Sequence, residues 1–179
     1  MFKTIQLEKF YRLINHGPCV LITSGPIDNP NLAPIAWNMP VNDEPAMAAI
    51  AVAESHYTTE LINKTGEFVI NLASKELLPV IKHCGAISGR KENKINKLGL
   101  ELETGKKVRV SHLKKAPGYL ECKVFEKHFY DGVILIIAKV LYAAVNEGLF
   151  DDYWLTEKAE VVHHLGGNYF ACLGKRFKI

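Results

Sequence analysis

Two long segments in the second half of the chain are joined by Asp131-Gly132. Residues 119–129 alternate loosely between apolar and polar side chains, and residues 133–145 are strongly apolar. An Asp-Gly pair between two such segments is typical of the two-residue turn of a β-hairpin. The sequence therefore predicts a long antiparallel hairpin in this half of the chain.

Shorter segments elsewhere also have the character of strands. The turn cluster Gly25–Pro30 separates two extended segments, which are expected to pair as a second hairpin. A glycine turn at His163–Asn168 leads into a last short strand. The strands expected besides the long hairpin are residues 19–24, 31–38, 46–52, 67–72 and 169–173.

Helical segments are short, and most are inserted near the middle of the chain. Ser55 is placed to cap one of them, and a loop at residues 84–89 separates two others. Because helices do not alternate with every strand, the pattern favours a mainly β fold, a β-barrel with helical insertions, over a doubly wound sheet. The expected helices are residues 7–14, 55–64, 75–83 and 91–98.

Size and charge fit one domain that binds a small anion. The 179 residues, 48% of them hydrophobic, are enough for one sizeable core, so a single domain over residues 1–179 is expected. The net charge of +3 comes from scattered basic residues with a local excess between Lys82 and Lys115. This distribution suits a small anion better than a nucleic-acid backbone, which calls for a broad basic face.

The cysteines and the hydropathy pattern indicate the cellular compartment in which the protein is expected. The four cysteines lie far apart and form no Cys-x-x-Cys pair, so no metal site or dithiol is indicated and free thiols in a reducing cytoplasm are expected. Residues 1–16 lack the hydrophobic centre of a signal peptide. No segment reaches about 18 uninterrupted apolar residues, so no membrane span is expected.

Two polar segments have the make-up of a phosphate site. Without a P-loop, a phosphate needs backbone N–H groups, hydroxyls and one or two cations, and a helix N-terminus supplies the N–H groups. Ser55-His-Tyr-Thr-Thr59 places hydroxyls at such a terminus, although an ordinary N-cap looks the same. Ser88-Gly-Arg90, with Lys94 one turn onward, adds cations and a glycine that admits an anion; alone it is equally a solvated basic loop.

A third segment, Asn31–Val41, suits a flat heterocycle. It combines small residues, an indole and two asparagines in one extended stretch. Small side chains let backbone N–H and C=O groups meet a polar ring edge, while an aromatic or a methionine covers a face. The alternative is that Trp37 and Met39 are ordinary core residues.

These segments occur in a characteristic order along nearly the whole chain. Each is weak alone, but the ordered set resembles the flavin reductase-like, FMN-binding split-barrel proteins, and within them the flavoredoxins. The resemblance implies a split β-barrel that binds FMN non-covalently as a homodimer. The motifs that carry it are residues 31–41, 55–62, 65–72, 88–90, Lys94, 98–100, 120–122 and 164–167.

The resemblance also implies roles for individual residues. Residues 36–41 would run along the isoalloxazine edge, and hydroxyls and cations from the two polar segments would hold the phosphate. Asn71 would lie near the flavin, and Tyr169 would reach the same cavity, from the other subunit in one arrangement. The full set of candidate cofactor-binding residues is Asn31, Ala36, Trp37, Asn38, Met39, Pro40, Val41, Ser55, His56, Thr58, Thr59, Asn71, Cys84, Ser88, Gly89, Arg90, Lys94 and Tyr169.

Three histidine-containing segments bear on the assignment of cofactor-binding residues. Relatives often carry arginine where this chain has His56, and a neutral imidazole attracts a phosphate less than a guanidinium does. Cys84 beside His83 is interpreted as a structural or flavin-lining residue, with an activated redox thiol as the alternative. His163 and His164 make a poor chelate because neighbouring residues of a strand point to opposite faces.

The expected function is electron or hydride transfer through bound FMN, with the protein orienting the flavin and no dedicated catalytic residue. The donor is left open between NADH, NADPH and a redox protein, and the acceptor between a protein and a small molecule. Two alternatives remain: a cofactor-free ligand-binding or assembly domain on the same barrel, and a flavoprotein of the pyridoxamine-phosphate-oxidase-like branch.

Overall fold

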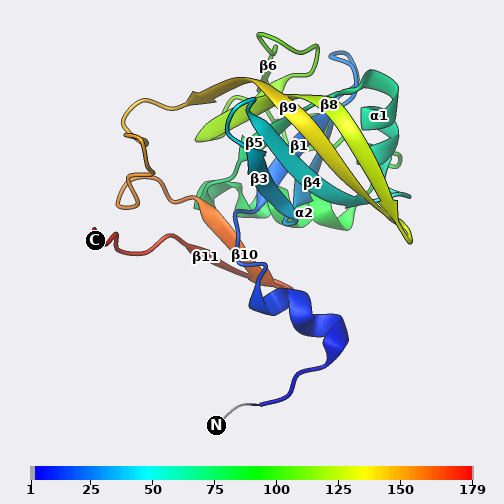
Figure 1. Ribbon diagram of the computed structural model, residues 1–179. Coiled ribbons are helices and arrows are strands. Elements are labelled where there is room, and N and C mark those ends of the chain that lie inside the picture. The colour runs from blue at the N-terminus through cyan, green and yellow to red at the C-terminus, as the bar shows by residue number, and fades with distance from the viewer. Residues whose placement is uncertain (1–2, 179) are drawn as a thin grey trace.

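A seven-stranded antiparallel sheet forms the centre of the computed structural model, which describes residues 3–178 (Figure 1). The strands follow one another across the sheet in the order β2-β1-β5-β8-β9-β4-β3. The expected mainly β fold is therefore confirmed. The seven strands are β1 (Val20–Ser24), β2 (Asn31–Ile35), β3 (Asn38–Asn42), β4 (Met47–Ala53), β5 (Glu67–Leu72), β8 (Gly118–Tyr130) and β9 (Val133–Val145).

The long hairpin expected from Asp131-Gly132 is present as β8 and β9. Tyr130 pairs with Val133 across the turn, and both turn residues have positive φ angles, 40° and 84°, as a type I′ turn requires. The register of β8 on β9 shifts twice, near Cys122 and near Phe125. Such β-bulges bend a strand and increase its twist, which helps this long pair wrap around the core.

The sheet curls because its two edge strands are consecutive in the chain. β2 and β3 lie at opposite ends of the strand order, yet only Ala36 and Trp37 separate them in sequence. The edges are thus tethered at one corner without pairing, which gives a split barrel. The single extended segment expected over residues 31–38 is accordingly wrong, because the chain ends β2 at Ile35 and starts β3 at Asn38. The barrel interior is filled by apolar side chains that include Ile22, Ile50, Ile62, Phe68 and Ile136.

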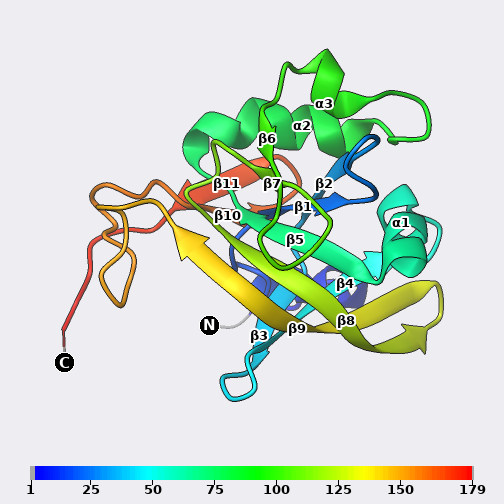
Figure 2. The same cartoon turned by 90° about the horizontal axis from the view of Figure 1, so that it is seen from above.

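Helices cover one side of the barrel. α1 (Tyr57–Thr65) lies beside β1, and α2 (Leu78–Ala86), which follows the 3₁₀ helix η2 (Lys75–Leu77), packs on β2 (Figure 2). α2 buries Ile81 and Cys84 in a second apolar cluster. Pro79 is accommodated in its first turn, where a backbone N–H would have no helical partner. α3 (Lys94–Lys97) is shorter than the helix expected over residues 91–98.

Two helix boundaries differ from the sequence expectation. α1 starts at Tyr57, so His56 and not Ser55 occupies the N-cap position. α2 continues through Cys84–Ala86, which were expected to begin a loop. Gly85 does not end the helix because it faces β2 closely: a Cβ there would lie 3.2 Å from Cγ of Pro34.

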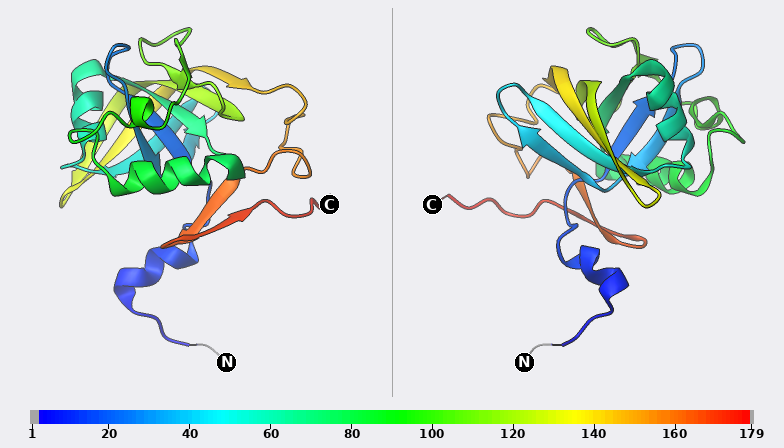
Figure 3. Two further views of the ribbon diagram at one scale, coloured as in Figure 1. Left: turned by 180° about the vertical axis from the view of Figure 1, so that it is seen from behind. Right: turned by 45° about the vertical axis from the view of Figure 1, so that its right-hand side comes forward.

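The segment before β1 meets the C-terminal part of the chain beside the barrel, where Pro18 bridges to His163. β10 (Val162–Gly166) and β11 (Tyr169–Cys172) form a hairpin that extends from the barrel, with the 3₁₀ helix η1 (Leu7–Leu13) beyond (Figure 3). β10 occupies the region expected to be only a turn, and the short strands β6 (Leu102–Glu103) and β7 (His112–Leu113) were not expected at all. Between residues 3 and 178 there is no helix with the length and apolar character needed to cross a membrane.

Candidate functional site

A polar cavity of about 300 Å³ lies where α1, β2 and the C-terminal end of α2 meet the 88–90 loop. We call it the anion cavity. Most of its walls come from residues that the sequence singled out, drawn from segments that are far apart in the chain. Its predicted lining residues are Asn31, Ser55, His56, Thr58, Cys84, Ser88, Gly89, Arg90 and Lys94; its other lining residues are Ala33, Pro34, Tyr57, Gly85, Ala86 and Ile87.

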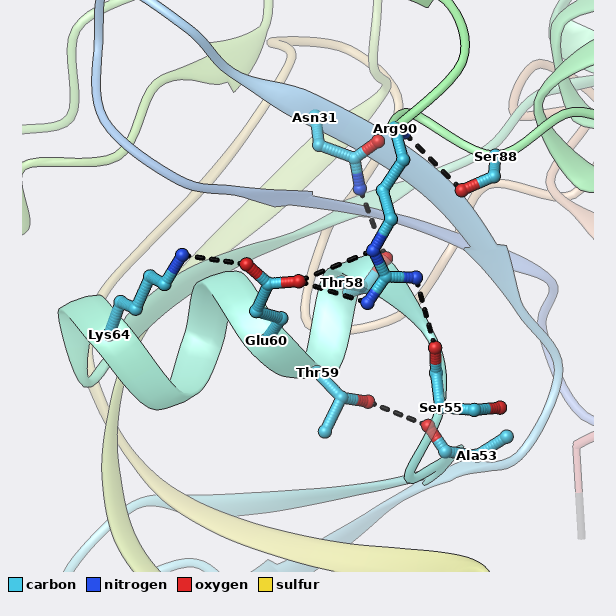
Figure 4. Close-up of polar contacts among 9 residues, drawn as sticks. All are labelled: Asn31, Ala53, Ser55, Thr58, Thr59, Glu60, Lys64, Ser88 and Arg90. Atoms are coloured by element: carbon cyan, nitrogen blue, oxygen red, sulfur yellow. Dashed lines mark hydrogen bonds and ion pairs between the residues drawn. The ribbon is translucent and has the colours of Figure 1, made fainter.

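The N-terminus of α1 opens onto this cavity. The first N–H groups of any helix have no intrahelical partner and carry the positive end of its dipole. Here the N-cap residue His56 makes no side-chain capping bond. Thr58 Oγ1 accepts a hydrogen bond of 3.0 Å from Asn31 Nδ2 (Figure 4), which leaves the threonine hydroxyl proton available as a donor. This wall of the cavity therefore presents hydrogen-bond donors.

The 88–90 loop approaches β2 and α1 so closely that only glycine fits at position 89. A Cβ on Gly89 would overlap Asn31 Oδ1 and lie 2.9 Å from Cδ1 of Tyr57. Gly89 therefore sets the close packing of the loop against the cavity wall. Asn31 Oδ1, buried under the glycine, has no hydrogen-bond partner among residues 3–178.

Arg90 crosses from this loop to α1 (Figure 4). Its Nε and Nη2 donate to Glu60 Oε2 at 3.3 and 2.9 Å, its Nη1 donates to the Ser55 carbonyl at 3.1 Å, and the guanidinium lies over the Tyr57 ring. Because a guanidinium has five N–H donors and these contacts use three, two remain. Hydrogen bonds from Lys64 and Arg90 lower the pKa of Glu60, which keeps it ionised.

Lys94 supplies a buried cation. Its side chain is only 4% exposed, and its Nζ donates to the Cys84 carbonyl at 3.2 Å. Among residues 3–178 it forms no ion pair with a carboxylate. Burial lowers the pKa of Lys94, because desolvation disfavours the charged form. Its ammonium has three N–H donors, so Lys94 has the chemistry to bind an anion in the cavity that it lines.

The redox-thiol interpretation of Cys84 finds no support in its surroundings. Burial raises the pKa of the Cys84 thiol, which favours the unreactive protonated form. The adjacent His83 does not activate it, since its Nε2 lies 2.6 Å from Glu92 Oε1. Cys84 serves the cavity through its backbone carbonyl, which accepts from Lys94.

Two predicted residues face the protein interior instead. The Asn71 amide donates to the Leu21 carbonyl at 2.8 Å and to Thr23 Oγ1 at 2.7 Å, and its Oδ1 accepts from Leu113 N at 2.7 Å. The Thr59 hydroxyl donates to the Ala53 carbonyl at 2.8 Å. Both side chains have partners within the protein and do not line the anion cavity.

The segment 36–41 lies on the surface at the open corner of the barrel. Trp37 is 44% and Met39 57% exposed, so the alternative that they are ordinary core residues is wrong. The Trp37 ring lies 5.7 Å from that of Tyr11, which brings the N-terminal segment to this corner. Tyr169 is exposed at the start of β11. Within this segment, Ala36 lines a second cavity beside the anion cavity.

That second, largely apolar cavity has a volume of about 760 Å³. It shares Pro34, Gly85 and Ala86 with the anion cavity and continues past Ala36 to the β10–β11 turn. Its further lining residues on α2 were not expected from the sequence, whereas the opposite wall includes residues of the glycine turn expected at 163–168. Together the two cavities offer a charged end and an apolar end along β2.

Comparisons with known proteins agree with this fold. An uncharacterised protein of Archaeoglobus fulgidus is 32% identical over 173 residues, 96% of this chain and 95% of its own length. The flavoredoxin of Desulfovibrio vulgaris has a TM-score of 0.89 at 21% identity, covering 100% and 97% of the two chains. The FMN-binding domain of a flavin reductases-like enzyme from Shewanella baltica has a TM-score of 0.82 at 25% identity, covering 99% and 96%.

A family model covers most of the chain. The model of the flavin reductase like domain matches residues 11–166, which span the barrel, the anion cavity and β10. Such a domain indicates a flavin-related redox function. The chain belongs to the flavin reductase-like family.

Proposed function

We propose that this protein is an FMN-dependent oxidoreductase whose anion cavity holds the flavin phosphate. The observation that carries the proposal is Lys94, a buried cation with one carbonyl contact beside a cavity into which a helix N-terminus opens. A phosphate would supply the missing negative charge and accept the free donors. The residues assigned to it are Ser55, Thr58, Ser88, Arg90 and Lys94.

The flavin ring system extends from that phosphate along β2. Ala33, Pro34 and Ala36 on one side and Gly85 and Ala86 on the other are small, so they leave room for a flat ring between the two cavities. Beyond Ala36, the backbone of residues 36–41 supplies N–H and C=O groups for the polar ring edge. Bound FMN supplies the acceptance and donation of electrons or hydride, and the chain binds and orients it.

A second copy of the chain completes the proposed site. β3 is an edge strand of the sheet that carries exposed Met39 and Val41 and directly follows exposed Trp37, a combination that soluble proteins usually cover. The β10–β11 hairpin, which carries Tyr169, extends from the barrel (Figure 3), and this position would let it contact a second copy. Analytical ultracentrifugation is expected to show a dimer; a monomer at micromolar concentration would contradict this part of the proposal.

The test of the flavin is spectroscopic. Purified protein incubated with FMN and freed of excess ligand is expected to show the two visible bands of an oxidised flavin. Colourless protein would contradict the proposal and favour a cofactor-free ligand-binding or assembly domain. Anaerobic titration with NADH and NADPH then identifies the donor, because bleaching by either shows a flavin reductase, whereas flavin that ignores both points to an electron carrier reduced by another protein.

A further inference from the structure

Glu60 belongs to the motif at residues 55–62 but is not among the candidate cofactor-binding residues. It lies in the first turn of α1, and its two carboxylate oxygens have different partners (Figure 4). Oε2 accepts from Nε and Nη2 of Arg90, and Oε1 accepts from Lys64 at 2.6 Å. The carboxylate therefore joins the α1 side of the anion cavity to the loop that carries Arg90.

We propose that Glu60 is a positioning residue that makes the site selective for a flavin with a phosphate over one without. This inference rests on the proposed function, because it assumes that the anion cavity takes the flavin phosphate. Glu60 acts through Arg90: it holds the guanidinium at the cavity mouth, with two N–H groups left for the ligand.

The need for such a support follows from the exposure of Arg90. Its side chain is 47% exposed, and a long side chain with that much freedom is costly to order when a ligand binds. Glu60, the Ser55 carbonyl and the Tyr57 ring restrict it from three sides, and all three belong to one short segment. The Arg90 side chain is thus already ordered before a phosphate binds.

A carboxylate beside an anion site also has an electrostatic effect, which Lys64 offsets. Two cations share the one carboxylate, so the cluster of Glu60, Lys64 and Arg90 keeps a net positive charge. Moreover, a carboxylate in the first turn of a helix interacts favourably with the helix dipole. Glu60 can therefore orient Arg90 without making the cavity repel an anion.

The experiment compares the dissociation constants of FMN and riboflavin, which differ only in the phosphate, by quenching of flavin fluorescence. Wild-type protein is expected to bind FMN more tightly than riboflavin. Glu60→Asp keeps the charge but withdraws the carboxylate by one methylene, and it is expected to lower the FMN-to-riboflavin preference by about three- to tenfold, the cost of ordering one side chain. Glu60→Gln keeps an acceptor at full length, and it is expected to retain the preference.

A matched control comes from the Glu157–Arg176 pair, whose N···O distance of 2.9 Å equals that of Glu60–Arg90. Glu157→Asp is expected to leave the preference unchanged. Equal affinities of the wild type for FMN and riboflavin would contradict the proposed function itself. A selective wild type with an equally selective Glu60→Asp variant would overturn only the role of Glu60, as would a loss of affinity shared by both flavins, or an equal loss in Glu157→Asp.

Discussion

Glu121 and Lys94 are both buried charges, but the protein satisfies only one of them. The Glu121 carboxylate, 0% exposed, accepts backbone N–H bonds from Lys106, Lys107 and Val108 at 2.7, 2.5 and 3.1 Å. Lys94, with three ammonium N–H donors, has a hydrogen bond only to the Cys84 carbonyl among the described side-chain contacts. The first charge fixes the 106–108 loop to β8; the second is left with capacity for a ligand.

This difference separates structural polar residues from binding residues without reference to any bound molecule. Asn71 resembles Glu121, because each polar atom of its amide has a partner within the chain. Arg90 is intermediate, with three of five donors used. The number of hydrogen-bond donors left without a partner on a buried or half-buried group thus indicates where an anion would bind.

The largest effect is expected from Glu121→Gln, which replaces the buried charge that has hydrogen-bond partners within the protein. An amide offers one oxygen, so its NH₂ group would face a backbone N–H that now points at a carboxylate oxygen. We expect the free energy of unfolding to fall by about 3–5 kcal/mol in urea denaturation. Glu126→Gln, at an exposed position on the same strand, is the control and should change it by less than about 0.5 kcal/mol. A small effect of both variants would show that Glu121 is not a structural anchor.

Lys94→Met replaces the buried charge that still has capacity for a ligand. It should preserve or raise stability without flavin but weaken FMN binding. Without flavin the variant is expected to be as stable as the wild type or more stable, because a buried cation with one partner is replaced by an apolar side chain. FMN affinity should fall by about ten- to a hundredfold, the loss of a charge-assisted contact. Flavin-free denaturation and FMN titration measure the two effects. Lys91→Met, an exposed neighbour, is the control; a Lys94 variant that loses stability and keeps its FMN affinity would contradict the comparison.

The sequence predicted the parts of the fold and of the site that depend on local chemistry. Asp131-Gly132 specifies its turn through two positive φ angles, and Ser88-Gly89-Arg90 stands out because glycine and cations occur together. The split between β2 and β3 was missed, because Ala36 and Trp37 carry no turn signal. Continuation of α2 through Gly85 was missed as well, since the reason is the approach of Pro34, 51 residues earlier in the chain.

Polar contacts between residues far apart in the chain could not be predicted from the sequence either. Glu60 and Arg90 are 30 residues apart, and Asn71 and Leu21 are 50 apart. A polar residue near the end of a strand, such as Asn71, or in the first turn of a helix, such as Thr59, looks the same whether it faces a ligand or bonds to a neighbouring element. That ambiguity explains why Asn71 and Thr59 were assigned to the cofactor, whereas the unused donors of Lys94 became visible only in the folded chain.

The pH dependence of flavin binding is expected to follow Lys94. Burial lowers its pKa below the ordinary 10.5, so the flavin-free folded state releases this proton at a lower pH than the unfolded chain does. Stability without flavin should therefore rise with pH between the lowered pKa and 10.5, through this group, and the rise should vanish in Lys94→Met. Over the same window the FMN-to-riboflavin preference should fall as the ammonium is lost. A preference that stays constant up to pH 10.5 would mean that Lys94 does not contact the phosphate.

Arg90→Ala is expected to have the smallest effect, because Arg90 is already partly satisfied by the protein. Its ion pair with Glu60 is exposed, and exposed pairs contribute little to stability, so the unfolding transition should hardly move. FMN affinity should fall by about three- to tenfold, less than for Lys94→Met, since Glu60 attenuates the charge that the phosphate meets. Riboflavin affinity should be unchanged.

Arg176→Ala, which breaks the matched surface pair with Glu157, is the control and should alter neither affinity. If Arg90→Ala weakened FMN binding more than Lys94→Met, the exposed guanidinium and not the buried ammonium would dominate phosphate recognition, and unused hydrogen bonds would be the wrong guide to the site.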